Sequence, residues 1–436
     1  MPSPGVKYGL KCISAVVRGQ IGVVLLALVG GLLPQRVAAQ ATGTQAPGAS
    51  TSSSSSVSMA PDFSQARPLD PSNAAAFERI YNLDYDRAVQ GFQKVLDRHP
   101  ENPFAVNHLL AAVMYREMYR MGLLDPGDFA DDSFLEAAHR PADPKAVSQI
   151  KALVERASTL EEERLKANPN DVDALYARGI TRALFATYTG LVERAWISAL
   201  RNAVGARKDH ERVLELSPGY LDAKLVVGVH NYVMGSLPTG LKIATSLVGL
   251  TGSREKGFQY LQEVGRSRGE NSTDARIALV LFLRRDQRYS EALEMLRGLL
   301  PQYPQNALLA LEEGSLLRSV HRNADAETVY RKIWQNGRAG IFGASHYELA
   351  ALYLGDLLRA EKDYVGAAAA YELVDEIAKP DAEVLQKANL GAGEMYDLER
   401  KRDLAVKKYD AVIATNGSSR PADTARKRLK EPYRVD

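Results

Sequence analysis

The chain has 436 residues, of which 45% are hydrophobic and 25% are charged, and its formal net charge is only +2. This composition is that of a folded protein, and it excludes collagen-like and wholly disordered chains. A nearly neutral chain lacks the basic excess that a general nucleic-acid binder needs, so we expect no nucleic-acid partner. The single cysteine excludes a scaffold of disulfides within the chain.

The first forty residues have the order of a secretory signal. Three Lys or Arg residues precede an apolar core of thirteen residues at 21–33, and small residues end at Ala39. The core is shorter than the ~20 residues that a membrane-spanning helix needs. We therefore predict a signal peptide over residues 1–39, cleaved after Ala39. The alternative is an uncleaved N-terminal anchor, because apolar residues before the core could lengthen it.

The predicted cleavage places the chain outside the cytoplasm. It removes Cys12, the only thiol, and a cysteine-free chain suits an oxidising compartment. We expect an exported protein, most simply in the periplasm, with association to the envelope membrane as the alternative. Residues 40–72 are rich in Ser, Ala, Pro, Gly and Thr, so they are interpreted as a disordered linker.

From residue 73 onward a helical frame recurs. Ala88, Phe92 and Val95 stand at relative spacings of 0, +4 and +7, on one face of a helix, and Pro100 stops that helix. A glycine in the preceding helix marks a point of close approach. The later copies are Ala206–His210–Val213, Ala292–Leu296–Leu299, Ala326–Tyr330–Ile333, Ala367–Tyr371–Val374 and Ala405–Tyr409–Val412, and the glycines are Gly179, Gly228, Gly314, Gly355 and Gly393.

This frame resembles the tetratricopeptide repeat (TPR), as found in exported bacterial TPR proteins. Ala292 and Ala326 are separated by 34 residues, the period of that repeat. The resemblance covers about residues 73–415. It implies an all-α fold, a right-handed α-solenoid of about eight TPR-like helix pairs, in one superhelical domain over residues 73–436. One pair cannot bury its own apolar face, so neighbouring pairs must stack. An unrelated helical bundle is the alternative.

Two departures from the frame stand in the N-terminal half. The pair that ends at Pro169 carries Glu161 and Arg164 at positions that are apolar elsewhere, which predicts a weak repeat. Three turns between paired helices are also enlarged, and because they fall at the same turn of the repeat we expect them to gather at one edge. The enlargements are about 35 residues before Ala157, about 15 before Ala206 and about 17 before Gly257.

The third enlargement, residues 235–257, is the most apolar. With the preceding GVHNY, residues 228–257 resemble a segment of a eukaryotic TPR family associated with inclusion-body clearance, and this resemblance carries no catalytic residues. The segment is interpreted either as a helix covering the inner surface or as a peripheral membrane or partner contact through residues 235–252. Its large apolar residues are Leu241, Ile243, Leu247, Val248 and Leu250.

No complete catalytic or metal-binding pattern is present. Ser148 and Ser253 each stand three residues before a lysine, as in penicillin-recognising enzymes, but the companion SDN and KTG elements do not accompany them. The seven histidines include no pair at the i, i+3 or i, i+4 spacing of helical zinc ligands, and the acidic run 125–132 lacks the calcium-hand spacing. We therefore expect no enzyme, no cofactor and no metal. A hydrolase hidden in the enlarged turns is the catalytic alternative.

The stretch from Arg400 to Arg434 holds eleven basic and four acidic residues. Such a stretch serves either as the polar cap that ends a solenoid or as an electrostatic docking patch for an acidic protein or an anionic lipid surface.

These features favour an exported TPR scaffold or adaptor that binds a protein partner through its concave groove and performs no catalysis. The alternative is a membrane-associated assembly or structural factor that handles cell-envelope components. In TPR proteins the first helices of the pairs line the groove, so the resemblance implies that nine residues of this chain face it. These partner-binding candidates are Asn107, Asp173, Tyr176, Asp222, Tyr232, Arg284, Arg318, Asp356 and Arg359.

Overall fold

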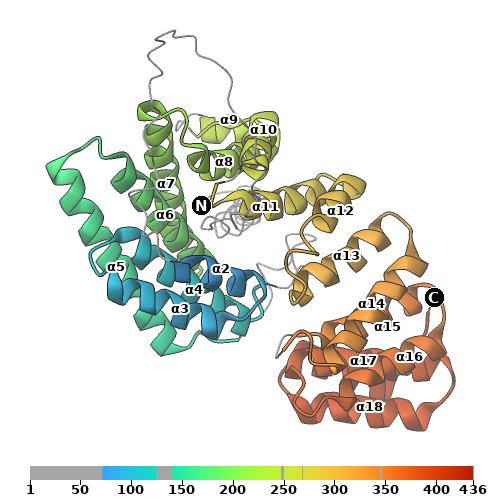
Figure 1. Cartoon of the computed structure of the whole chain (residues 1–436). Coiled ribbons are helices and arrows are strands. Elements are labelled where there is room, and N and C mark those ends of the chain that lie inside the picture. Colours follow the sequence, from blue (N-terminus) through green and yellow to red (C-terminus); the bar gives the residue numbers. More distant parts are fainter. Residues whose placement is uncertain (1–70, 125–139, 247–249, 268, 344–345, 436) are drawn as a thin grey trace, which may run out of the picture. The chain divides into compact units, whose positions relative to one another are not determined.

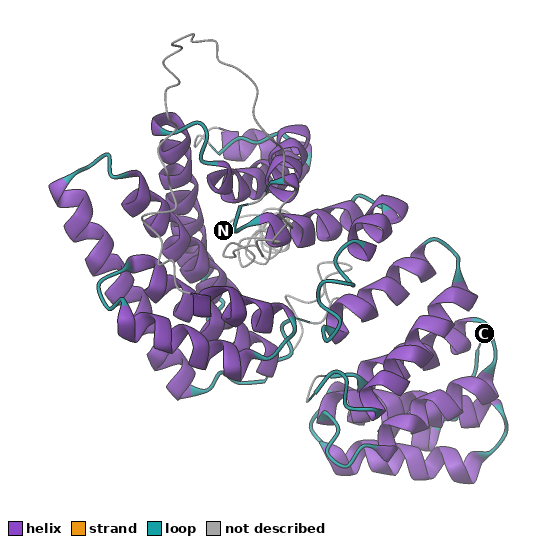
Figure 2. Cartoon of the chain, in the orientation of Figure 1, coloured by secondary structure: helices purple, strands orange, loops and turns teal. Residues whose placement is uncertain are grey.

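The computed structural model describes residues 71–124, 140–246, 250–267, 269–343 and 346–435. Every regular element in these ranges is a helix, and they contain no β-strand (Figure 2). The all-α prediction is therefore confirmed. The predicted signal peptide and nearly all of the predicted linker lie outside the described residues, whose first helix begins at Pro71, close to the expected start of the repeats.

The helices follow one another as antiparallel pairs of a first (A) and a second (B) helix (Figure 1). The A helices are α2 (Pro71–Tyr81), α4 (Pro103–Arg120), α6 (Val172–Thr187), α8 (Lys224–Ser236), α11 (Ser272–Arg285), α13 (Ala307–Ser319), α15 (Glu348–Ala360) and α17 (Ala382–Leu398). The B helices are α3 (Tyr85–Arg98), α5 (Pro144–Ala167), α7 (Trp196–Leu216), α10 (Arg254–Arg266), α12 (Tyr289–Arg297), α14 (Asn323–Arg338), α16 (Tyr364–Glu372) and α18 (Arg402–Thr415). These eight pairs match the predicted number, and α19 (Arg420–Lys430) follows the last of them.

The described pairs form two compact units. The described part of unit 1 is residues 71–124, 140–246, 250–267 and 269–282, and that of unit 2 is residues 283–343 and 346–435. The boundary falls inside α11. Consecutive helices pack on one another from α2 to α8 and from α12 to α19, as α4 does on α5 and α17 on α18, so these pairs bury their apolar faces against their neighbours.

The recurrent frame forms the core of the pairs. The frame alanines Ala88, Ala206, Ala292, Ala326, Ala367 and Ala405 are all 0% exposed. In unit 2 each frame tyrosine packs on the glycine of its A helix: a Cβ atom on Gly314 would lie 2.3 Å from Cε1 of Tyr330, and one on Gly355 would lie 2.4 Å from Cε1 of Tyr371. In unit 1 the ring of His210 meets Gly179 in the same way. These TPR-type contacts confirm the role predicted for the glycines.

The three enlarged turns lie between A and B helices, and part of the added length extends the B helices. The helix α5 has 24 residues and α7 has 21, against 14 for α3. The second enlargement adds a π-helical segment, Tyr188–Val192, to the end of α6, and the third forms the short helix α9 (Thr239–Ser246). Residues 125–139 of the first enlargement lie outside the described residues. Among the described helices, none combines the length and the apolar character needed to cross a membrane.

The short turns between A and B helices share a left-handed residue that is not glycine. The backbone φ is +62° at Leu83, +59° at Gln287, +59° at His321, +66° at Lys362 and +60° at Arg400. An L-residue pays about 1–2 kcal/mol in this conformation. The left-handed residue recurs in these turns because it reverses the chain within a few residues, so that the B helix starts beside the A helix.

Candidate partner-binding surfaces

Three of the nine groove candidates, Asn107, Tyr176 and Tyr232, lie in the core of unit 1. Their side chains are at most 1% exposed. The Tyr176 ring packs against His210 and Tyr220, and its hydroxyl accepts a hydrogen bond of 2.8 Å from Asn271 Nδ2. The Tyr232 ring stacks on Phe282, with centroids 3.8 Å apart. These side chains stabilise the packing of pairs and have no surface to offer a partner.

The remaining candidates of unit 1 stand at the start of A helices. Asp222 is 8% exposed, and its carboxylate accepts a hydrogen bond of 3.2 Å from the backbone N–H of Asn271. Asp173 is half-buried in the first turn of α6. Asp222 therefore joins the fourth A helix to the start of α11, a structural role that a groove assignment did not anticipate.

In unit 2 the candidates Arg284 and Asp356 make polar contacts with side chains of other helices. Arg284 of α11 pairs with Glu312 of α13, and both side chains are largely buried. Asp356 of α15 accepts a hydrogen bond of 2.7 Å from the Tyr371 hydroxyl, and burial together with this carboxylate raises the pKa of Tyr371. Arg318 is half-buried on α13.

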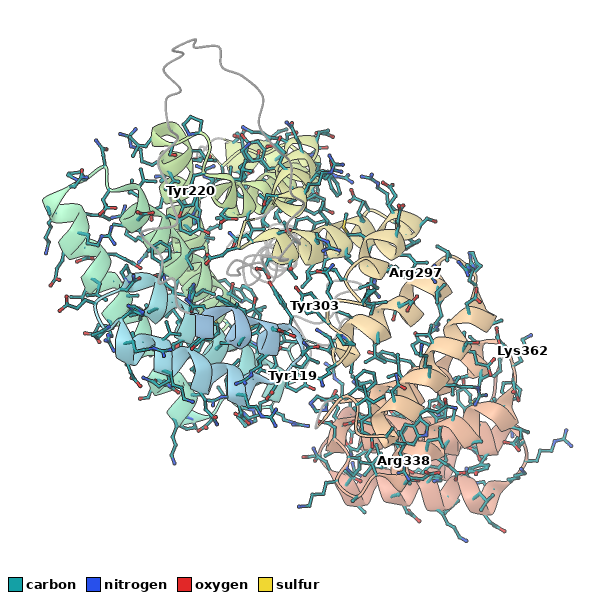
Figure 3. The ribbon with its side chains drawn as sticks, in the orientation of Figure 1. Tyr119, Tyr220, Arg297, Tyr303, Arg338 and Lys362 are labelled. Atoms are coloured by element: carbon teal, nitrogen blue, oxygen red, sulfur yellow. The ribbon has the colours of Figure 1, made fainter. Side chains whose placement is uncertain are left out.

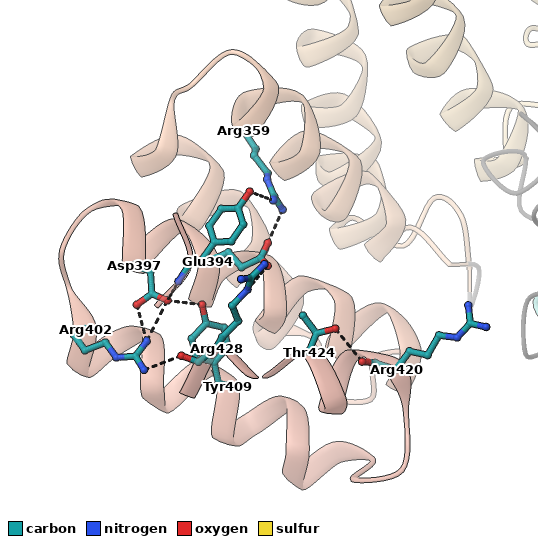
Figure 4. A network of polar contacts seen from close by, with 9 residues as sticks. Arg359, Glu394, Asp397, Arg402, Tyr409, Arg420, Thr424 and Arg428 are labelled. Carbon is teal, nitrogen blue, oxygen red and sulfur yellow. Dashed lines mark hydrogen bonds and ion pairs between the residues drawn. The ribbon is translucent and has the colours of Figure 1, made fainter. Parts of the chain in front are cut away.

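Arg359, the last candidate, lies in a dense polar cluster at the ends of α15 and α17 (Figure 4). Its guanidinium lies 2.9 Å from Glu394 Oε2, and Arg428 Nε of α19 lies 3.2 Å from Glu394 Oε1. Burial alone would lower the pKa of Arg359, but the Glu394 carboxylate and the Tyr433 hydroxyl outweigh it and raise that pKa.

The same cluster holds an extended segment of the chain, residues 431–435, which follows α19. The Tyr433 hydroxyl accepts a hydrogen bond of 2.8 Å from Arg359 Nη2, and the Tyr433 backbone N–H donates one of 2.8 Å to Asp397 Oδ2. The ring lies close to two guanidiniums, with its centroid 4.6 Å from Arg428 Cζ and 5.1 Å from Arg359 Cζ. We call Arg359, Glu394, Asp397 and Arg428 the Tyr433 surface.

The Tyr433 surface is fixed by residues other than the segment it holds. Asp397 is anchored by Arg402 Nη1 at 2.8 Å and by the Tyr409 hydroxyl at 2.8 Å. Arg402 also donates to the carbonyls of Arg428 and Leu429, at 2.8 and 2.7 Å, and so satisfies the end of α19. The cations and carboxylates of the surface therefore stay in place on contacts within α15, α17, α18 and α19.

The predicted basic stretch is divided between internal pairs and an exposed helix face. Arg402 and Arg428 serve the cluster just described, and Lys408 pairs with Glu372 and Asp375, at 2.9 and 2.7 Å. On α19 the buried residues are Ala422 and Ala425, and the exposed basic residues are Arg420, Arg426, Lys427 and Lys430. The helix thus covers the last pair with its small residues and presents charge outward, as a solenoid cap does.

Glu161 of unit 1 is buried in a polar chain rather than marking a weak repeat. It is 0% exposed, its Oε1 lies 2.5 Å from Thr181 Oγ1, and Thr181 Oγ1 lies 2.7 Å from Asn107 Oδ1. Asn107 Nδ2 donates in turn to the carbonyl of Ala177 at 3.0 Å. Burial raises the pKa of Glu161 to about 7, against the lowering effect of its hydrogen bonds. A protonated Glu161 can donate from Oε1 to Thr181, which in turn donates to Asn107 Oδ1, while Glu161 Oε2 is buried without a hydrogen-bond partner.

The third enlarged turn presents one large apolar side chain. Ile243 of α9 is 61% exposed, and the adjacent Lys242 is exposed as well. Leu250 is half-buried. Leu247 and Val248 lie outside the described residues, as does the side chain of Leu241.

Within the described ranges, no group of three or more His, Cys, Asp or Glu side chains is arranged to hold a metal ion. Ser253, one of the two serines with a lysine three residues on, caps α10: its hydroxyl accepts a hydrogen bond of 3.2 Å from the Lys256 backbone N–H. This contact gives Ser253 a structural role at the helix start.

The comparisons with known proteins return helical-repeat structures at low similarity. A comparison with protein-family models finds no match, and neither does one with curated proteins. Among solved structures, Pseudomonas aeruginosa PilF is 18% identical with a TM-score of 0.34, covering 58% of this chain and 99% of its own. The human IFIT1 dimer with PPP-AAAA is 15% identical with a TM-score of 0.36, covering 83% of this chain and 82% of its own. The P58(IPK) TPR domain is 12% identical with a TM-score of 0.21, covering 83% of this chain and 98% of its own. At these values the likeness carries no argument about function.

Proposed function

We propose that the chain is an exported, non-catalytic scaffold that binds a protein partner across the A helices of unit 2. The observation that carries this proposal is the segment 431–435, an extended piece of chain held by side chains of α15, α17 and α19. A helical array that holds one extended segment through fixed cations and carboxylates has the chemistry to hold another. Binding of this kind needs geometry and charge but no reacting group.

Lysine-directed crosslinking of the mature protein in its native envelope tests the binding site. Lys362 (Figure 3) and Lys401 lie in the turns after α15 and α17, beside the Tyr433 surface, and both are exposed. Lys332 of α14 and Lys407 of α18 are exposed on B helices and serve as matched controls. We expect peptides of a partner to crosslink to Lys362 and Lys401. Crosslinks confined to Lys332 and Lys407 would contradict binding across the A helices.

Export is a separate part of the proposal and rests on residues 1–39. The basic start, short apolar core and small residues at Ala39 are those of a cleaved secretory signal. N-terminal sequencing of the protein recovered from the envelope fraction should find a chain that starts at Gln40. A recovered chain that starts at Met1 would favour the retained anchor instead.

A second candidate function, contact with the envelope membrane, is favoured by Ile243. An isoleucine that is 61% exposed beside an exposed lysine is the pairing found where a helix lies on an anionic bilayer. Flotation of the mature protein with vesicles containing an anionic lipid should then decrease in Ile243→Asp, with Ile341→Asp as the matched control, since Ile341 is 43% exposed elsewhere. Equal flotation of the two variants would remove this candidate.

A further inference from the structure

We propose that residues 431–435 are a built-in occupant of a docking surface whose partner is an extended segment presenting a tyrosine. This inference rests on the proposed function and names the partner's chemistry and the way in which the chain itself competes for the site. The surface is the Tyr433 surface, and the competing group is Tyr433 itself.

The first step is that the segment is held by one residue. Tyr433 makes the hydrogen bonds to Arg359 and Asp397 and places its ring close to the two guanidiniums. Its neighbours Glu431, Pro432, Arg434 and Val435 are all exposed, the last at 57%. Glu431 donates its backbone N–H to the Lys427 carbonyl at the end of α19, and beyond it the segment is attached through the Tyr433 side chain and backbone N–H. Residues 432–435 can therefore detach without unfolding the helices beneath them.

The second step is that the surface keeps its form without the segment. Glu394 holds both Arg359 and Arg428, while Arg402 and Tyr409 hold Asp397 (Figure 4). The carbonyls of Arg428 and Leu429 at the end of α19 accept hydrogen bonds from Arg402, so this helix end does not depend on Tyr433. A surface organised in this way is ready for a ligand before the ligand arrives.

The third step is the chemistry of recognition. Two guanidiniums within about 5 Å of a ring centroid favour an aromatic side chain, and Arg359 requires an acceptor at the position of the phenol oxygen. Asp397 requires a backbone N–H at the same residue, which excludes proline there. The carboxylates of Glu394 and Asp397 offset two of the three guanidiniums of Arg359, Arg402 and Arg428, and the phenol oxygen of a tyrosine supplies the acceptor that Arg359 needs.

The fourth step is competition. A tether within one chain gives the segment an effective concentration of the order of millimolar at its own site. A partner segment must compete with this effective concentration to displace Tyr433. The intact chain therefore binds the partner weakly until the partner adds contacts elsewhere on the A helices. The segment thereby sets a threshold for docking.

The experiment uses a blocked peptide, acetyl-EPYRV-amide, that carries 3-fluorotyrosine and is observed by ¹⁹F NMR, a readout suited to weak binding. The mature chain is compared with a chain truncated after Glu431, which keeps the cap of α19. We expect the bound fraction of peptide to be at least ~5-fold larger with the truncated chain, because the tethered competitor is gone. The peptide with alanine in place of tyrosine should not bind.

Two variants of the truncated chain locate the site. Arg359→Gln should abolish peptide binding, whereas Arg420→Gln, a matched change on the exposed face of α19, should leave it unchanged. Both variants are checked by thermal melting so that a folding defect is recognised. Peptide binding that is equal in the intact and truncated chains, or absent from a folded truncated chain, would overturn the proposal.

A dimer of the intact chain that dissociates in Tyr433→Ala would also overturn it, because the segment would then serve a second copy. Failure here remains distinct from failure of the proposed function. Partner crosslinks at Lys362 and Lys401 without peptide binding would leave the scaffold standing and remove only the competing role of Tyr433.

Discussion

A Cβ atom placed on Gly314 would lie 2.3 Å from Cε1 of Tyr330, so the A and B helices of this pair meet through a hydrogen atom and an aromatic ring. The ring is 0% exposed and cannot move aside without disturbing the core. Gly355 with Tyr371 and Gly393 with Tyr409 repeat the relationship along unit 2.

Gly314→Ala should therefore destabilise the chain by about 1–3 kcal/mol, the usual cost of an overpacked core. Denaturant unfolding followed by circular dichroism measures it. The matched control is Gly219→Ala, because a Cβ atom there meets nothing within 4 Å and should change stability by less than ~0.5 kcal/mol. Equal effects of the two changes would show that the helices do not approach at Gly314.

Lys362→Gly should stabilise the chain by about 0.5–1 kcal/mol. Lys362 is exposed with a backbone φ of +66°, so glycine removes the strain of the left-handed conformation and keeps part of the gain after its larger loss of entropy. The control is Lys332→Gly, an equally exposed lysine inside α14, which should lose about 1 kcal/mol. If both changes destabilise, the turn conformation is not under strain.

Glu161→Gln should change the pH dependence of stability. The folded pKa of Glu161, about 7, lies above the ordinary 4.5, so its stabilising protonated form is complete below pH 4.5 and is lost as pH rises through 7. Relative to Glu161→Gln, the native chain should lose up to about 3 kcal/mol between pH 5 and pH 8. Unfolding of both proteins at these two pH values gives the difference, and a constant difference would contradict a buried neutral carboxyl.

His210 should act in the opposite direction at lower pH. Burial lowers the pKa of His210 from 6.5 to about 4, against the raising effect of its contact with the Ala206 carbonyl. Its neutral form supports the fold above pH 6.5, and that support is lost as pH falls toward 4. His210→Phe, which keeps an aromatic ring against Tyr176, should therefore resist acid better than the native chain. Acid unfolding of the two proteins, followed by circular dichroism, measures the difference, and equal acid stability would contradict a neutral His210 in the fold.

The repeat frame could be predicted because it is local. Tyr330 and Gly314 are 16 residues apart in the sequence, and both the helical spacing of the alanines and the period of 34 residues bring them together on paired helices. The number of pairs follows from the same spacing. The lengths of α5 and α7 could not be predicted from this spacing. In the sequence, an enlarged turn cannot be told from a longer helix when the added residues favour helix.

The roles of single polar residues could not be predicted, because they depend on partners distant in the sequence. Glu161 breaks the apolar pattern of its own helix, but it is satisfied by Thr181 and Asn107. Tyr176 stands at a groove position of the repeat, yet Asn271, 95 residues on, closes over it. The contact of Tyr433 with Arg359 could not be predicted, because the two residues are 74 positions apart and Tyr433 lies in an irregular segment outside the repeat frame.

The buried carboxyl of Glu161 also bears on how the repeats find their order during folding. Thr181 stands two residues after its frame glycine, where the four other A helices with a frame glycine carry His230, Leu316, Leu357 and Met395. Of these five side chains, Thr181 alone offers a hydroxyl. If α5 docked against another A helix, Glu161 would be buried without its partner, at a cost of several kcal/mol. Repeats of similar sequence can pack in the wrong order during folding. The cost of burying Glu161 away from Thr181 favours the packing of α5 against α6.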